Sequence, residues 1–208
     1  MVQNLLMNIK LWQKNSTFIF NLFYMNQTNK ITLAIILLTA TILRFIKYPE
    51  IPFTHDEFSA IFRLDFGSFS EMIDKGVRID GHPAGIQVFL WYWTKLFGFN
   101  EWVVKLPFTI MGILSVFLIY IIGVKWYNRT TGLISAAFLA SIQYTVIYSQ
   151  IARPYISGLF FSLLMVNSLT NIIKNPQSKR LQNYCLFILS ASLCAYNHYF
   201  SLLFAIIA

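Results

Sequence analysis

The chain has 208 residues, of which 57% are hydrophobic and 12% charged, and its formal net charge is +8. A soluble domain carries about twice this share of charged residues, so the composition excludes an ordinary soluble enzyme and favours a multi-pass membrane protein. The Lys and Arg residues lie between apolar runs, without a basic stripe of interleaved aromatics. We therefore expect membrane lipids rather than nucleic acid as partners.

Residues 1–30 precede the first long apolar run and are predicted to form a cytoplasmic or interfacial segment. Lys10 and Lys14 are basic, but the apolar stretch after them is short and no small-residue cleavage site follows, which is unlike a signal peptide. The segment could lie on the membrane surface as an amphipathic helix, or it could form a poorly ordered tail. Residues 31–208 are predicted to form the transmembrane domain.

Six apolar runs follow, and the charge of the loops decides how many of them cross the membrane. If all six crossed, the basic loops KWYNR (125–129) and KNPQSKR (174–180) would face outside, against the tendency of Lys and Arg to stay in the cytoplasm. If the run at 83–98 lies in the interface instead, both loops return inside. We therefore predict an all-α polytopic fold with about five spans and the N-terminus inside. The runs are 31–48, 83–98, 104–125, 131–149, 155–173 and 183–208.

Residues 49–103 become a large first outer loop in this arrangement. DEFSAIFRLDF and SFSEMIDKGV mix polar and apolar residues at helical spacing, which predicts one or two juxtamembrane helices. RIDGHPAG (78–85) contains Gly81 and Pro83 and is typical of a turn that leads into the next helix. The chain ends inside the apolar run SLLFAIIA, so we interpret the transmembrane domain as partial, the N-terminal portion of a longer protein.

The polar residues gather on the outer side of this predicted topology. A site that binds a lipid phosphate and a sugar at the bilayer surface needs carboxylates, basic groups and flat aromatic rings, and this side supplies all three. The predicted outer set comprises Asp56, Glu57, Arg63, Asp65, Arg78, Asp80, His82 and Arg153, with Lys105 and His198 in the outer parts of two spans.

Five motifs follow one another along the chain: HDE, DGHPAG, LFGFNEWVVKLP, YSQIARPY and YNHYF. From about residue 31 to the end, the chain resembles the GT-C superfamily of polyprenyl-phosphate-dependent glycosyltransferases, in particular the protein O-mannosyltransferase-like family and the lipid A aminoarabinose transferases. The resemblance implies a sugar donor linked to polyprenyl phosphate and a hydroxyl acceptor on a lipid, glycan or protein. It also implies a site that faces outward from the cytoplasmic (inner) membrane.

Asp56 and Glu57 are the candidate catalytic residues. The resemblance places an essential acid at Asp56, and an inverting transfer needs a base for the acceptor hydroxyl, which a carboxylate provides. A structural alternative is that the sequence THDE opens the first loop helix, where the helix dipole favours an acid near the N-terminus. Glu57 could provide this cap alone.

The candidate substrate-binding and phosphate-binding residues are basic groups from four segments: Arg78, His82, Lys105, Arg153 and His198. Arg78 and His82 flank the turn before a membrane-lying helix, whose N-terminus adds positive potential. Lys105 corresponds to an arginine in the resembled family, whereas the family's acid near Arg153 is replaced by Ile151. The alternatives are solvated charges at the turn, interfacial anchors for Lys105 and Arg153, and a neutral, hydrogen-bonded His198. Arg44 is expected to be a snorkelling anchor.

The sequence predicts no cofactor. It contains no Cys/His spacing typical of a metal site and no glycine-rich phosphate loop, which also disfavours a nucleotide-sugar donor. Two acids could hold a divalent cation, but the resemblance implies no metal requirement. Two other functions remain open. A transporter or flippase would place its charges at mid-bilayer on broken helices, and a truncated relative would be non-catalytic.

Overall fold

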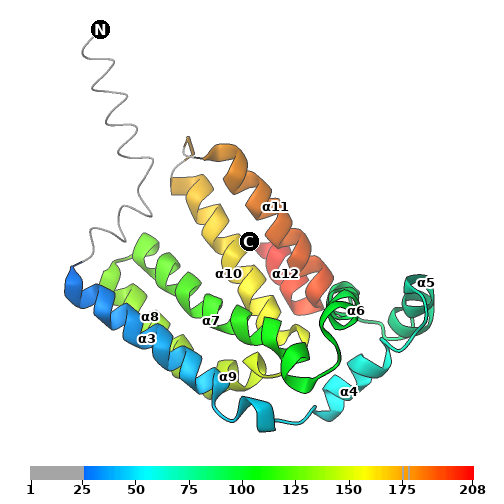
Figure 1. Ribbon diagram of the computed structural model, residues 1–208. Coiled ribbons are helices and arrows are strands. Elements are labelled where there is room, and N and C mark those ends of the chain that lie inside the picture. Colours follow the sequence, from blue (N-terminus) through cyan, green and yellow to red (C-terminus); the bar gives the residue numbers. More distant parts are fainter. Residues whose placement is uncertain (1–25, 175, 178) are drawn as a thin grey trace.

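The computed structural model describes residues 26–174, 176–177 and 179–208, and these residues form a bundle of α-helices without a β-strand (Figure 1). The prediction of an all-α polytopic membrane protein is confirmed. Most of the predicted N-terminal segment, residues 1–25, lies outside the described residues. The helices are α3 (Gln27–Phe45), α4 (His55–Phe62), α5 (Phe69–Glu71), α6 (Gly85–Phe97), α7 (Glu101–Trp126), α8 (Arg129–Ser141), α9 (Gln143–Ser149), α10 (Pro154–Lys174), α11 (Arg180–Asn197) and α12 (Tyr199–Ile207).

Three segments of the described chain are long and apolar enough to cross a membrane: Gln27–Glu50, which contains α3, and the helices α7 and α10. Helices α8 and α9 are a fourth candidate if they count as one span, although a bend of 60° separates them. The predicted fifth span at 183–208 differs in the structure, because His198 divides this run into α11 and α12. Helix α11 is polar at both ends and α12 has nine residues, so neither belongs to the candidate spans.

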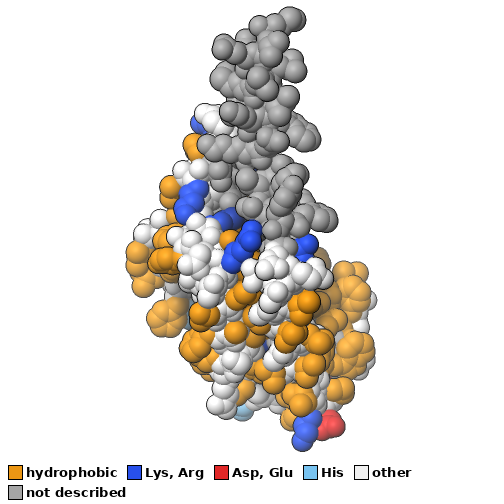
Figure 2. Space-filling model, turned by 90° about the vertical axis from the view of Figure 1, so that its left-hand side faces the viewer, with side chains coloured by type: hydrophobic (Ala, Val, Ile, Leu, Met, Phe, Trp, Pro, Cys, Tyr) orange, Lys and Arg blue, Asp and Glu red, His pale blue; other side chains and the backbone are white. Residues whose placement is uncertain are grey.

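The connections between helices lie at two opposite ends of the bundle (Figure 1). One end holds the start of α3 and the α7–α8 and α10–α11 connections. Figure 2 shows blue Lys and Arg side chains at this end, next to the grey segment. We call this end of the bundle the basic end. The opposite end holds the short 3₁₀ segment η1 (Tyr48–Glu50), helices α4 to α6 and helix α9. All eight Asp and Glu residues fall between positions 50 and 101, so we call this the acidic end. The basic end carries Lys30, Lys125, Arg129, Lys174, Lys179 and Arg180.

Short helices form between α3 and α7 because the sequence contains strong caps. The Thr54 hydroxyl accepts a bond from the Glu57 amide, and the Glu57 carboxylate accepts one from the Thr54 amide at 2.9 Å, which starts α4 with a capping box. Ser68 caps α5, which continues into the π-helical segment η2 (Met72–Val77). Helix α6 has 13 residues and is therefore only about 20 Å long, which is too short to cross the bilayer. The run at 83–98 was expected to lie in the interface instead.

A proline inside α7 explains how α6 is attached to that helix. Pro107 has no N–H, so the carbonyl of Val103 one turn earlier has no backbone donor within the helix. The indole Nε1 of Trp93 on α6 donates to this carbonyl at 2.9 Å. Leu90 on α6 and Phe108 on α7 are buried in the same hydrophobic cluster, which also joins the two helices.

Arg44 on α3 is fully buried, which corrects the expectation of a snorkelling anchor. Its guanidinium donates to the carbonyls of Leu139 and Ala140 at 3.3 and 3.1 Å, and to the hydroxyl of Ser149 at 3.0 Å. These two carbonyls belong to the last turn of α8, where the bend leaves them without helical donors. Arg44 therefore caps the bent span from a neighbouring helix, and it holds α9 in place through Ser149.

Candidate functional site

Asp56 meets the segment that precedes α10 at the acidic end. The carboxylate Oδ2 of Asp56 accepts a hydrogen bond from Arg153 Nε at 2.9 Å and another from the Tyr155 hydroxyl at 3.3 Å. The Asp56 side chain remains 47% exposed, and its Oδ1 has no protein donor among the described residues. The Arg153 contact uses Nε alone, so the two Nη groups are available for a ligand.

His82 lies in a turn that is held from both sides. Gly81 has φ +65°, a conformation that glycine adopts without strain, and its carbonyl accepts the hydroxyl of Tyr199 at 2.5 Å. The ring nitrogen Nδ1 of His82 lies 3.0 Å from the backbone oxygen of Asp80, whose carboxylate pairs with Arg63 at 2.6 Å. These contacts fix the turn, and they leave the His82 side chain 48% exposed.

His198 stands at the break between α11 and α12. The adjacent Asn197 is buried and fastens this break to the first turn of α10, because its amide accepts from Ser157 at 2.6 Å and donates to the Pro154 carbonyl at 2.7 Å. His198 Nδ1 accepts a hydrogen bond from the Phe200 amide at 3.2 Å, which starts α12. Its other ring nitrogen, Nε2, is then the protonated one in the neutral ring.

The two histidines and Arg153 form one electrostatic group. The His82 and His198 rings lie 6.1 Å apart, centroid to centroid. Burial lowers the pKa of His198 below its ordinary value, and the positive charges of His82 and Arg153 lower it further. We call Asp56, His82, Arg153, Tyr155 and His198 the outer cluster. It brings together three of the five predicted basic residues and the leading predicted carboxylate, from four separate segments of the chain.

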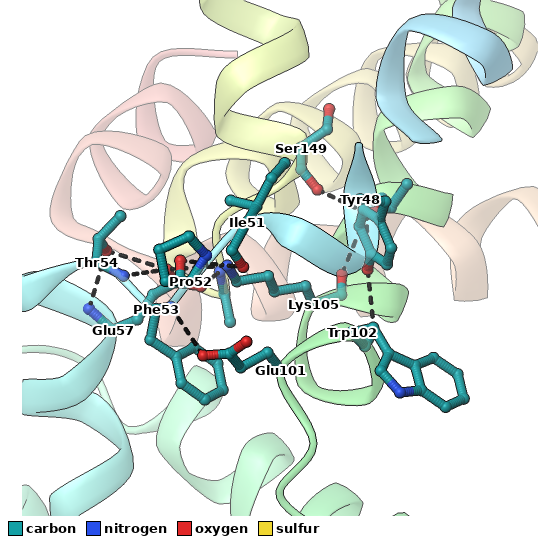
Figure 3. A network of polar contacts seen from close by, with 12 residues as sticks. Tyr48, Ile51, Pro52, Phe53, Thr54, Glu57, Glu101, Trp102, Lys105 and Ser149 are labelled. Carbon is teal, nitrogen blue, oxygen red and sulfur yellow. Dashed lines mark hydrogen bonds and ion pairs between the residues drawn. The ribbon is translucent and has the colours of Figure 1, made fainter. Parts of the chain in front are cut away.

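Glu57 and Lys105 belong to a network of polar contacts with residues 51–54 (Figure 3). Both side chains are fully buried, with Lys105 Nζ 3.7 Å from Glu57 Oε2. Lys105 Nζ also donates to the backbone carbonyls of Ile51 and Pro52, at 3.0 and 2.8 Å. In this conformation neither residue offers surface to a substrate. The helix cap considered for Glu57 fits its position, whereas the full burial of Lys105 does not fit an interfacial anchor.

Glu57 connects α4 to the segment that carries Arg153. Its Oε1 accepts a hydrogen bond from the amide of Ala152 at 2.7 Å, while Oε2 caps α4 through Thr54. Asp56 and Arg153 are the chain neighbours of these two residues, so the buried contact sets the distance at which they pair. Glu57 is therefore placed as a positioning residue for Asp56 and Arg153.

Arg78 is the predicted phosphate ligand that the structure leaves outside the outer cluster. Its Nη1 pairs with Asp74 Oδ1 at 3.0 Å, one turn back along the chain, and its side chain is 75% exposed. The described residues also contain no group of three or more His, Cys, Asp and Glu side chains that could hold a metal ion.

Sequence reasoning missed three residues that build this region: Tyr155, Asn197 and Tyr199. All three stand inside motifs that served only as markers of resemblance, YSQIARPY and YNHYF, and their closeness to Arg153 and His198 was the available signal. The partners of Asn197 are about 40 residues away in the sequence, so only the fold shows its role.

A comparison with known protein families gives a match. A family model described as dolichyl-phosphate-mannose-protein mannosyltransferase matches residues 81–208, which is more than half of the chain. The match includes His82, Arg153 and His198 but begins after Asp56. No curated protein and no solved structure matches the chain.

Proposed function

The chain belongs to the dolichyl-phosphate-mannose-protein mannosyltransferase family, a family of membrane glycosyltransferases, and from this premise we propose its reaction in detail. It transfers one sugar, with inversion, from a polyprenyl-phosphate carrier to an acceptor hydroxyl on a lipid, glycan or protein. The acidic end faces outside the cytoplasmic membrane and the basic end faces the cytoplasm, because Lys and Arg are retained on the cytoplasmic side. The observation that carries this proposal is the convergence of Asp56, Arg153, His82 and His198 at one end of the bundle.

Asp56 acts as the base in this proposal. Its free Oδ1 accepts the proton of the acceptor hydroxyl while the acceptor oxygen bonds to the anomeric carbon of the sugar. The bond between that carbon and the phosphate oxygen breaks, and its electrons leave with the lipid phosphate. Arg153 holds the Asp56 carboxylate through Oδ2, which keeps Oδ1 directed to the acceptor.

The leaving phosphate is stabilised by the basic members of the outer cluster. The free Nη groups of Arg153 suit two phosphate oxygens, and His82 and the Nε2–H of His198 supply further donors. These donors are fixed before the substrate arrives, so they favour the developing charge without reorganisation. Glu57 and Lys105 serve the reaction by holding Asp56 and Arg153 in register, and Arg78 is not part of the proposed phosphate set.

The first test measures retention of a polyprenyl phosphate by the detergent-purified chain, using native mass spectrometry. We expect saturable retention by the wild type and at least about tenfold weaker retention by the double variant His82→Ala/Arg153→Ala, because two charge-assisted donors are lost. Lys75→Ala is the matched control, since Lys75 is an exposed outer-loop cation paired with Glu71 at 2.6 Å. Arg78→Ala should behave like this control.

The second test is a transfer assay with Asp56→Asn, which should retain the polyprenyl phosphate but lose sugar transfer. A folded wild-type chain that retains no polyprenyl phosphate would refute the phosphate site. Full transfer by Asp56→Asn would refute the assignment of the base while leaving the phosphate site intact.

A further inference from the structure

We propose that the basic end binds an anionic phospholipid, with the lipid phosphate beside Lys174 in a cavity between α7 and α10. The cavity measures about 180 Å³ and is lined by Trp126, Thr170, Ile173 and Lys174. An indole and an isoleucine beside an ammonium group suit a glycerophosphate headgroup and its first acyl carbons, since aromatic rings and lysines favour the membrane interface. This site lies at the opposite end from the outer cluster, so the inference does not rest on the proposed reaction.

Hydrogen bonds between α7 and α10 hold the cavity in shape. Trp126 Nε1 donates to the Thr170 hydroxyl at 2.9 Å, and Lys125 Nζ donates to the amide oxygens of Asn167 and Asn171 at 2.7 and 2.6 Å. Lys174 Nζ donates to the backbone carbonyl of Lys125. An ammonium group has three N–H donors, and the described residues engage one of those of Lys174, which leaves two for a phosphate.

The charge of this end complements an anionic headgroup and little else in a membrane. Six Lys and Arg residues stand on its described segments, and all eight carboxylates of the chain lie between positions 50 and 101. Arg129 is three residues beyond Trp126, so its Cα is within about 11 Å of that of Trp126, at the same end of the bundle. The tendency of Lys and Arg to stay in the cytoplasm explains why these residues gather at one end of the bundle. It does not explain why a cavity lies there beside Trp126.

The test compares phosphatidylglycerol with phosphatidylcholine of the same acyl chains, bound to the delipidated full chain in detergent and measured by native mass spectrometry. We expect the wild type to retain one phosphatidylglycerol in preference to phosphatidylcholine. Lys174→Gln should weaken this retention about fivefold, and adding Arg129→Gln should weaken it further, because each cation near an anionic lipid contributes a similar increment. Inorganic phosphate should not displace the lipid.

Two controls separate this site from the rest of the molecule. Lys95→Gln removes a lysine that lies 5.5 Å from a tryptophan ring, Trp91, but on α6 at the acidic end, and it should leave retention unchanged. The outer variant His82→Ala/Arg153→Ala should also keep the phosphatidylglycerol. Equal retention of phosphatidylcholine, displacement by inorganic phosphate, or unchanged retention in Lys174→Gln would each overturn the proposal.

Discussion

Asp56 and Glu57 are adjacent in the sequence, but the fold gives their carboxylates different surroundings. Asp56 is half exposed and pairs with Arg153 where a ligand has access, whereas Glu57 is buried against Lys105 and the amide of Ala152. Consecutive residues of a helix point about 100° apart, so one side chain of α4 faces the outer cluster while the next faces the interior. The pair therefore divides into a half-exposed residue, which we propose as the base, and a buried structural one.

Replacing each of these two carboxylates should change the stability of the protein by a different amount. Glu57→Gln leaves Lys105 buried without its ionic partner, which should lower the unfolding free energy by about 3 kcal/mol or more, whereas Asp56→Asn removes an exposed pair and should lower it by less than about 1 kcal/mol. Thermal unfolding in detergent, followed by tryptophan fluorescence, measures both. Adding Lys105→Met to Glu57→Gln should recover part of the loss. Equal destabilisation by the two single variants would contradict the assigned roles.

Binding of a phosphate at the outer cluster should depend on pH through His198. Burial lowers the pKa of this histidine in the free protein, and a bound phosphate favours the protonated ring, so binding takes up a proton. Retention of polyprenyl phosphate should therefore increase as the pH falls from about 8 to about 5.5. His198→Gln should reduce this increase.

Without ligand the same protonation should have the opposite effect on stability. Because the pKa of His198 is lower in the folded chain than in the unfolded one, acidification through this range favours the unfolded state. Thermal unfolding of the ligand-free chain should therefore occur at a lower temperature at pH about 5.5 than at pH about 8. A profile of retention that is identical in wild type and His198→Gln would contradict the role of this residue.

At the scale of helices, the site depends on two breaks in apolar segments. The bend between α8 and α9 brings Arg153 and Ala152 towards α4, and the break at His198 places this histidine beside the first turn of α10. Each break exposes helix-end carbonyls or amides, which side chains of neighbouring helices must satisfy within a membrane. Arg44 does this for the first break, and Asn197 fastens the second.

Replacing Arg44 should release helix α9. Arg44→Met removes the donors to Leu139 and Ala140 and the contact with Ser149, so amides of residues 143–149 should exchange with deuterium at least about tenfold faster. Hydrogen exchange followed by mass spectrometry resolves this segment from α10, whose exchange should stay near that of the wild type. Arg180→Met, a basic residue at the other end, is the control. Unchanged exchange of 143–149 would show that Arg44 does not hold the bend.

At the scale of the molecule, the chain is electrically polarised along the bundle. Every Asp and Glu lies in residues 50–101 at one end, and the charged side chains in the described part of the opposite end are all Lys or Arg. This distribution places the outer cluster and the proposed phospholipid cavity on opposite sides of the membrane. It also gives the topology a direct test.

Cysteine labelling should report this orientation. In a variant without Cys185 and Cys194, Lys75→Cys should react with a membrane-impermeant maleimide in intact cells, because it belongs to the exterior acidic end. Arg180→Cys should react only after permeabilisation. Labelling that follows the reverse pattern would place the outer cluster in the cytoplasm and remove the basis for an outward-facing site.

The sequence was most informative where a pattern is local or repeats along the chain. Apolar runs predicted the helical bundle, and loop charges predicted which ends lie together. The short run before α7 was expected not to cross, and its helix is not among the candidate spans. The fifth span was not found among the candidates, because His198 and the polar ends of α11 divide a run whose average composition is apolar. Averaging over a window hides such a break.

The site was predicted less completely because its geometry depends on distant contacts. Asp56, His82, Arg153 and His198 were selected by residue type and motif, and whether they act on a substrate stays a prediction. The burial of Glu57, Lys105 and Arg44 could not be foreseen, because their partners include backbone groups of loops and of a helix end elsewhere in the chain. The pattern of side chains in a sequence does not show which backbone carbonyls will lack a hydrogen-bond donor in the fold.

The contact between the His82 turn and the start of α12 has a consequence for how the protein is made. Gly81 is bonded by Tyr199, and a side-chain carbon at Gly85 would lie only 2.4 Å from the Tyr196 carbonyl, so the two regions fit closely although more than 100 residues separate them. At roughly 5–20 residues per second, a ribosome needs several seconds to add the intervening chain. During that interval the segment of α4 to α6 lacks the partner against which its turn is ordered. The outer cluster is thus completed only after α11 and α12 have been synthesised.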